Sequence, residues 1–260
     1  MSNAWPALND FYMQLLQRVF ETDLEEQLTY LSVVANARHI PVEWLIEQGI
    51  FFIPNNDYVA YHMGNGAKDP SYGFYLNGDC IWNQFVVIPV RDLANKVVGF
   101  TGWDAKNKYL AEYKGEVGLP MYKVSGKYLF NREDHFLTIP ALLKDRFSCG
   151  TIFLVDGVFD CLSLCQKGIP TIAMLGSTLS GTVAYFLRWY RKVYVVKDND
   201  DAGNKLLQRV RAMVPSVRAV IQSKTKDIEE YLRDDMARDH AISVLEKVMA
   251  SEGDLGDIRL

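Results

Sequence analysis

The feature that most constrains this chain is a regular alternation of short apolar runs and helix-like segments, which begins at residue 151. Four short, mostly apolar runs have the length and composition of buried strands: 151–155, 171–175, 193–196 and 217–221. The segments after them have helical apolar spacing: 157–167, 182–190, 202–213 and 227–233. Strands that alternate with helices pair in parallel and are covered on both faces, so we expect an α/β fold with a parallel sheet.

Acidic residues directly follow two of the predicted strands. Asp156 comes after the first run, and Asp198 and Asp200 come after the third. In open parallel sheets, ligands gather beyond the carboxyl ends of the strands. Three carboxylates at one such edge repel each other unless a cation compensates them, and ligands that are all oxygen favour Mg²⁺ or Mn²⁺ over zinc. The pattern predicts a metal site at this edge.

A second acidic pair repeats the spacing of the first. Asp227 and Glu229 follow the fourth run at i and i+2, as Asp198 and Asp200 follow the third. In an extended segment such side chains project to the same side, so the second pair could hold a second ion. Two cations about 3.5–4 Å apart support phosphoryl transfer. The alternative is plain turn chemistry after strands, which is the better interpretation of any one of these pieces alone; their joint placement favours the metal site.

The first half of the chain has a different texture. Residues 8–48 have helical spacing, 51–82 are typical of short strands and loops, and 85–90 and 96–103 predict a β-hairpin. The change near 147–150 predicts three parts. They are a mixed α+β N-terminal subdomain over 1–147, the α/β domain over 148–235, and a C-terminal helix and tail over 236–260.

A basic stretch lies at the end of this first half. From Arg91 to Arg132 there are eight cations and four acids, a net charge of +4 in a chain whose total is −4. Tyrosines and Trp103 lie between the cations and could stack bases beside a charged groove. The alternative is a solvated loop whose tyrosines pack on the sheet.

The spacing of the cysteines and the hydropathy of the chain indicate the cellular compartment in which we expect the protein. No Cys-x-x-Cys pair occurs, so we expect no zinc. Cys161 and Cys165 lie one helical turn apart in an apolar stretch and are expected to be buried thiols of a reducing cytoplasm. No apolar run approaches the length of a membrane span, and no export signal is evident, so we expect a cytoplasmic protein without membrane contact.

At this point the motifs resemble a known family. The α/β half resembles the Toprim domain, and the first half resembles the polymerase core of bacterial and bacteriophage DNA primases of the DnaG type. The Toprim-like segments are 153–160, 175–177, 198–203 and 226–232, and the primase-like segments are 10–31, 87–92, 97–102 and 127–129. The resemblance covers roughly residues 8–235. It departs from the family at Asp156, where glutamate is usual.

The resemblance implies synthesis of short RNA primers on single-stranded DNA from NTPs, a nucleotidyl transfer that serves DNA replication in a bacterial cell or a phage-infected host. It implies catalytic roles for Asp156, Asp198 and Asp200. Two or more Mg²⁺ or Mn²⁺ ions would be held by the acidic set Asp156, Asp160, Asp198, Asp200, Asp227 and Glu229. Template or nucleotide contacts would come from Arg91, Lys127 and Asn131.

Two other functions stay open at this stage. One is a Toprim nuclease that uses similar metals, and the other is a non-catalytic subunit that binds single-stranded DNA. The primase zinc-binding module and a sizeable helicase-docking domain have no counterpart in these motifs. We therefore expect a partner, either a replicative helicase or a separate protein that recognises the template.

Overall fold

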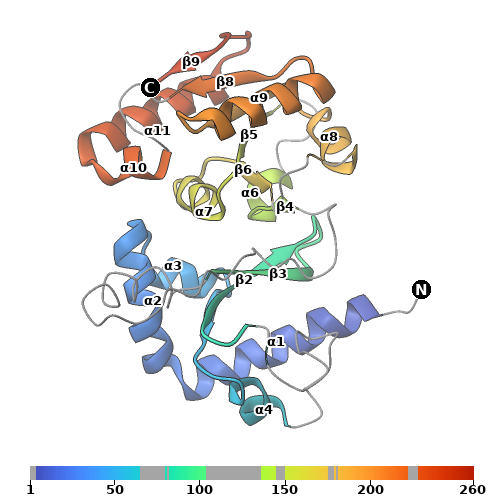
Figure 1. Ribbon diagram of the computed structural model, residues 1–260, viewed down its shortest axis with the longest axis vertical. Helices are drawn as coiled ribbons and strands as arrows, with labels where there is room; N and C mark the ends of the chain where they lie inside the picture. The colour runs from blue at the N-terminus through green and yellow to red at the C-terminus, as the bar shows by residue number, and fades with distance from the viewer. Residues whose placement is uncertain are drawn as a thin grey trace. The chain divides into compact units, whose positions relative to one another are not determined.

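The computed structural model describes residues 4–64, 80, 82–103, 136–144, 150–174, 179, 181–221 and 228–260. The chain divides into two compact units (Figure 1). The first comprises 1–37, 41–90 and 96–131, and the second comprises 38–40, 91–95 and 132–260. In the described part of the chain, no helix is both long enough and apolar enough to span a bilayer.

The first unit is built from helices around a small antiparallel sheet. Its helices are α1 (Ala4–Thr22), α2 (Leu24–Arg38), α3 (Val42–Glu47) and α4 (Tyr58–Met63). Its strands are β1 (Phe51–Ile53), β2 (Phe85–Arg91) and β3 (Val97–Trp103), in the order β1-β2-β3. The predicted hairpin between β2 and β3 is present. Its turn closes through Asn95, whose φ of 66° is left-handed and whose N–H donates to the Asp92 carbonyl at 2.9 Å.

The second unit contains the predicted parallel sheet. Its strands are β4 (Phe136–Leu137), β5 (Thr151–Val155), β6 (Thr171–Met174), β7 (Lys192–Lys197), β8 (Arg218–Ile221) and β9 (Ile258–Arg259). They are ordered β4-β6-β5-β7-β8-β9, and all but β4 are parallel. The central strands β5, β6 and β7 are mostly apolar because both faces of the sheet are covered. The α/β prediction is confirmed.

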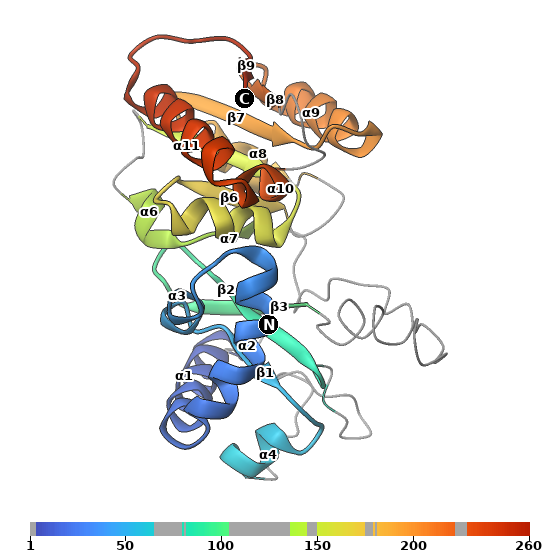
Figure 2. The same ribbon diagram turned by 90° about the vertical axis from the view of Figure 1, so that its left-hand side faces the viewer.

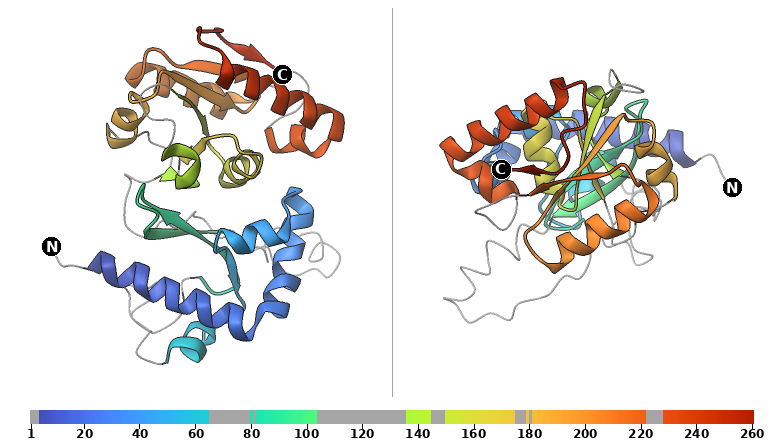
Figure 3. Two further views of the ribbon diagram at one scale, coloured as in Figure 1. Left: turned by 180° about the vertical axis from the view of Figure 1, so that it is seen from behind. Right: turned by 90° about the horizontal axis from the view of Figure 1, so that it is seen from above.

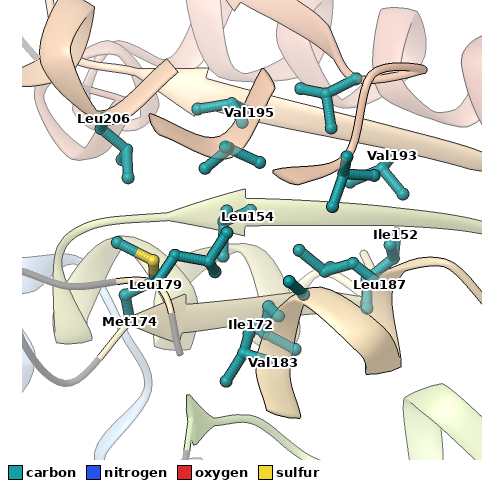
Figure 4. Packing of buried hydrophobic residues seen from close by; sticks show 14 of the residues in the cluster. Ile152, Leu154, Ile172, Met174, Leu179, Val183, Leu187, Val193, Val195 and Leu206 are labelled. Carbon is teal, nitrogen blue, oxygen red and sulfur yellow. The ribbon is translucent and has the colours of Figure 1, made fainter. Parts of the chain in front are cut away.

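Helices cover both faces of this sheet. They are α6 (Pro140–Lys144), α7 (Val158–Gln166), α8 (Gly181–Leu187), α9 (Asp201–Met213), α10 (Ile228–Arg233) and α11 (Asp235–Ala250). On one face, α8 and α9 bury their apolar sides against alternate residues of the strands, among them Ile152, Leu154, Val193 and Val195 (Figure 4). The opposite face is covered by α7, α10 and α11 (Figures 2 and 3).

The two cysteines of α7 are buried, as the sequence predicts. Cys161 and Cys165 are buried free thiols whose sulfur atoms are 3.9 Å apart. Burial raises the pKa of the Cys161 thiol because the apolar surroundings disfavour its thiolate. A neutral thiol in the core behaves as a small apolar side chain, so we assign Cys161 a packing role.

The C-terminal segment completes the sheet. After α11 the chain returns to pair β9 in parallel with β8, and the Leu260 N–H donates to the Ile221 carbonyl at 2.9 Å. Lys192 at the start of β7 holds the end of α11, because its ammonium donates to the carbonyls of Val248 and Ser251. Residues 236–260 are thus part of the α/β unit.

We predict that the attachment of β9 weakens in acid. Asp257 accepts from the Ala219 N–H at 2.8 Å and pairs with Arg211 at 3.0 Å, and these contacts lower its pKa below the ordinary 3.8. A carboxyl group whose pKa is lower in the folded than in the unfolded protein stabilises the fold. This contribution is complete at pH values above the unfolded-state pKa, and it is lost as the pH falls through the folded-state pKa. The effect is at most about 1 kcal/mol because the pair is solvent-exposed.

Hydrogen exchange of the β9 amides across the acid range measures this effect. Asp257→Asn keeps an acceptor for Ala219 but removes the titrating charge, so its exchange should change less with pH than that of the wild type. An unchanged pH profile in the variant would show that another group controls the attachment.

Candidate metal and catalytic site

Two predicted site residues lie at one edge of the parallel sheet. Asp156 is the first residue after β5, and Asp198 is the first residue after β7. The two strands are direct neighbours, with Leu154 opposite Val195. That register, continued by two residues, brings Asp156 opposite Lys197, one position before Asp198. Because neighbouring strands lie about 4.8 Å apart, the backbones of the two aspartates are close together. Asp156 is exposed and Asp198 is half-buried.

Asp200 has a second, local role at the same edge. It is the N-cap of α9, with extended backbone angles (φ −141°, ψ 179°), and its Oδ1 accepts from the Gly203 N–H at 2.9 Å. This bond satisfies one of the amide groups that the first turn of any helix leaves without a partner. The positive end of the helix dipole also favours negative charge here. The turn-chemistry interpretation therefore holds for Asp200, and it leaves Oδ2 for other contacts.

Two glycines bring main chain and carboxylates close together at this edge. A Cβ on Gly203 would lie 2.2 Å from the carbonyl oxygen of Asp198, so only glycine lets the first turn of α9 close on that backbone. A Cβ on Gly157 would lie 2.0 Å from an Asp160 carboxylate oxygen. The Asp160 carboxylate is therefore folded back against the residue that follows Asp156.

The other predicted site residues are placed differently. Asp227, Lys127 and Asn131 lie outside the described residues. Glu229 is in α10, and its side chain is likewise outside the description. Arg91 ends β2, where its Nη1 donates to the Asn95 carbonyl at 3.3 Å across the hairpin turn.

The donor set at this edge fits a hard divalent cation by type. Asp156, Asp160, Asp198 and Asp200 offer carboxylate oxygens only, the ligands that Mg²⁺ and Mn²⁺ prefer. Within the ranges that the structure describes, no three acidic, histidine or cysteine side chains are grouped closely enough to hold a metal. The predicted set also includes Asp227 and Glu229, whose side chains lie outside the described residues. The metal site therefore stays a prediction.

One residue at this edge was not singled out by the sequence analysis. Lys197 ends β7, and only 9% of it is exposed. A lysine buried along its stem at the carboxyl end of a strand places positive charge at the edge where the aspartates lie. The signal was present in the sequence, as a lysine between an apolar strand and an Asp-x-Asp pair, a position where apolar residues normally continue.

The double role of Asp200 leads to a prediction that separates cap from ligand. Asp200→Ala should lower the free energy of unfolding by about 1 kcal/mol because the cap is lost. Asp200→Asn should leave it nearly unchanged, since asparagine caps as well as aspartate, yet it should weaken Mn²⁺ binding because a carboxylate is gone. Chemical denaturation and calorimetric titration with Mn²⁺ measure the two effects. If Asp200→Asn bound Mn²⁺ as tightly as the wild type, Asp200 would be a helix cap and not a metal ligand.

Comparison with known protein families supports the Toprim resemblance. Residues 153–232, which include the strand ends described above, match a family model described as Toprim-like. The match covers the carboxylates at the ends of β5 and β7 and the segment that follows β8. The α/β unit therefore contains a Toprim-like domain.

Comparison with individual proteins extends the likeness to most of the chain. The DNA primase of Aquifex aeolicus is 27% identical over 198 residues, which are 75% of this chain and 37% of the primase. A DnaG catalytic core superposes with a TM-score of 0.65 at 20% identity, covering 95% of this chain and 79% of that one. A DnaG catalytic domain bound to single-stranded DNA superposes at 0.61 and 19% identity, covering 95% and 77%.

These comparisons confirm the fold. The chain has the fold of the DnaG catalytic core, with a Toprim-like domain in its second half. It spans about a third of the length of the curated primases that it matches.

Proposed function

We propose that this chain, with its Toprim-like domain and primase-core fold, makes short RNA primers on single-stranded DNA. The observation that carries the proposal is the placement of Asp156 and Asp198 at the ends of two adjacent parallel strands inside that fold. Named DNA primases are the relatives that the sequence matches over three-quarters of its length. The work would take place in the cytoplasm of a bacterium or of its phage-infected host.

The reaction is a nucleotidyl transfer. The 3′-hydroxyl of one nucleotide attacks the α-phosphorus of an incoming NTP, a new P–O bond forms, and the bond to the β-phosphate breaks to release pyrophosphate. Asp156, Asp198 and Asp200 would hold Mg²⁺ or Mn²⁺ together with Asp160, Asp227 and Glu229. Such ions, when bound, neutralise triphosphate charge and make the hydroxyl a better nucleophile.

The substrates and partners belong to the same proposal. Single-stranded DNA is the template that we propose, since one of the structures with this fold is a DnaG domain bound to it. Arg91, Lys127 and Asn131 would contact the template or the incoming NTP, within a template-binding part over 1–147 that precedes the metal-binding part over 148–235. A replicative helicase or a separate template-recognition protein would direct the enzyme to its start sites.

A primer-synthesis assay tests the proposal. The protein is incubated with single-stranded DNA, labelled NTPs and Mg²⁺ or Mn²⁺, and the products are separated by size. Metal-dependent oligoribonucleotides support the proposal. Shortened DNA would instead indicate a nuclease, and DNA binding without either product, with candidate partners added, would indicate a non-catalytic subunit.

A further inference from the structure

Two large aromatic side chains are exposed together at the end of α8. Tyr185 is 62% exposed and Trp189 is 53% exposed. Their ring centroids are 5.9 Å apart, with the planes at 74°. Aromatic side chains of this size are normally buried, so a pair that keeps half its surface in water is a candidate contact surface.

The sequence on either side of this pair is positively charged. Between Asp160 and Asp198 the chain has five cations and no acid. Two of the five, Arg188 and Arg191, flank Trp189 and are exposed. Arg188 donates to the Met213 carbonyl at 2.6 Å and Arg191 to the Ser251 carbonyl at 3.1 Å. These acceptors carry no full charge, and each guanidinium has five N–H donors, so donors remain for an anion.

The neighbouring helix adds to the same field. The bond from Arg188 to Met213 joins the end of α8 to the end of α9. On α9, Lys205 and Arg209 are exposed as well. Exposed cations thus flank the aromatic pair at the end of α8, and further exposed cations lie on α9. Cations beside exposed rings suit a polyanion with flat, unpaired rings.

This surface is separate from the acidic edge. α8 follows β6 and leads back to the start of β7, so its last turn lies at the amino end of the sheet. Asp198 lies at the carboxyl end of β7. The five residue steps of that strand span roughly 17 Å. A ligand on Trp189 therefore does not occupy the carboxylate edge.

We propose that Tyr185, Arg188, Trp189 and Arg191 form a second contact surface for single-stranded nucleic acid. Bases stack on the two rings and phosphates bind the two guanidinium groups. A duplex hides its base faces, and an acidic protein segment has no bases to stack, so the aromatic pair favours a single strand. The inference rests on the proposed function only for the class of ligand.

Binding of labelled oligothymidylates tests the proposal. The probes are about 4 and about 16 nucleotides long, the range that single-strand-binding sites cover. Tyr185→Ala combined with Trp189→Ala should raise the Kd of the longer probe about tenfold, with less than about a twofold effect on the shorter. Arg188→Glu combined with Arg191→Glu should also weaken the salt dependence of binding to the longer probe. The slope of log K against log salt concentration should become shallower by about 1.4, since each phosphate contact on a single strand contributes about 0.7.

Matched controls keep the result specific. Tyr61→Ala removes an aromatic side chain that is 78% exposed in the first unit, and Lys247→Glu reverses an exposed charge on α11 across the sheet. Both should bind the longer probe like the wild type. Trp189→Phe keeps a ring and should bind almost normally, which guards against an effect of misfolding.

Two outcomes would overturn the proposal. One is unchanged affinity of the double alanine variant for the longer probe. The other is equally tight binding of polyglutamate by the wild type and the double alanine variant, which would indicate an acidic protein partner. Asp198→Asn should bind both probes normally even if no primer is made, so failure of the proposed activity and failure of this surface give different results.

Discussion

Replacing Asp198 by asparagine is expected to slow metal-dependent primer synthesis by at least about 100-fold, the scale on which loss of one electrostatic contact to a reacting group is measured. Asparagine keeps the size and an oxygen ligand but removes the negative charge that would hold a divalent cation at the carboxyl end of β7. The side chain is only half-buried, so the free energy of unfolding should change by less than about 0.5 kcal/mol.

The measurement is the yield of oligoribonucleotide over time, with thermal unfolding recorded in parallel. Asp201→Asn is the matched control: it makes the same chemical change three residues later, at an exposed position in the first turn of α9. That variant should stay within about twofold of the wild type. Equal activity of Asp198→Asn and the control would remove Asp198 from the catalytic set.

Much of the second unit follows from local pattern alone. Residues 151–155 form a strand with the predicted bounds, because a short apolar run between polar residues suits a strand covered on both faces. The strand predicted over 193–196 extends by one residue at each end, to Lys192 and Lys197. A prediction from hydropathy leaves Lys192 out of the strand because the residue is charged. In the structure its ammonium donates to the carbonyls at the end of α11, a contact with a segment that is distant in the sequence.

The errors of prediction have tertiary causes. Residues 8–48 have helical spacing with no predicted break near Asp23, yet the structure ends α1 at Thr22 and begins α2 at Leu24. At the break, an Asp23 carboxylate oxygen lies 3.0 Å from His62 Nε2 on α4. β9 is two residues long. The segment that leads into it is held by the pairs Arg218–Asp254 and Arg211–Asp257, and the terminal Leu260 is buried, but none of these contacts leaves a periodic signal in the sequence.

The candidate site was predictable from the sequence only in part. The sequence places carboxylates after strands, but it does not show which strands are neighbours. β5 lies between β6 and β7, although β6 separates them in the sequence. That crossover brings Asp156 beside Asp198, and the right-handed rule for parallel strands permits it without requiring it. The roles of the residues outside the described ranges stay predictions.

Gly203→Ala should destabilise the protein by about 2 kcal/mol and lower primer synthesis at least about tenfold. Alanine in a helix is normally favoured over glycine by up to about 1 kcal/mol, so the expected sign is opposite to helix propensity. The reason is steric: the added Cβ would lie 2.2 Å from the Asp198 carbonyl oxygen and 2.7 Å from its nitrogen, and main-chain atoms cannot rotate away. The α9 turn or the Asp198 segment must move.

Gly181→Ala is the matched control for this effect, since a Cβ at the start of α8 has nothing within 4 Å, and it should be neutral or slightly stabilising. Gly157→Ala tests the other side of the edge, because its Cβ meets the movable end of the Asp160 side chain. It should preserve stability while it displaces that carboxylate. Denaturant unfolding and primer yield, measured on all three variants, separate main-chain strain from loss of a ligand. A fully stable and active Gly203→Ala would mean that α9 does not close on Asp198, and the geometry of the carboxylate edge would then be wrong.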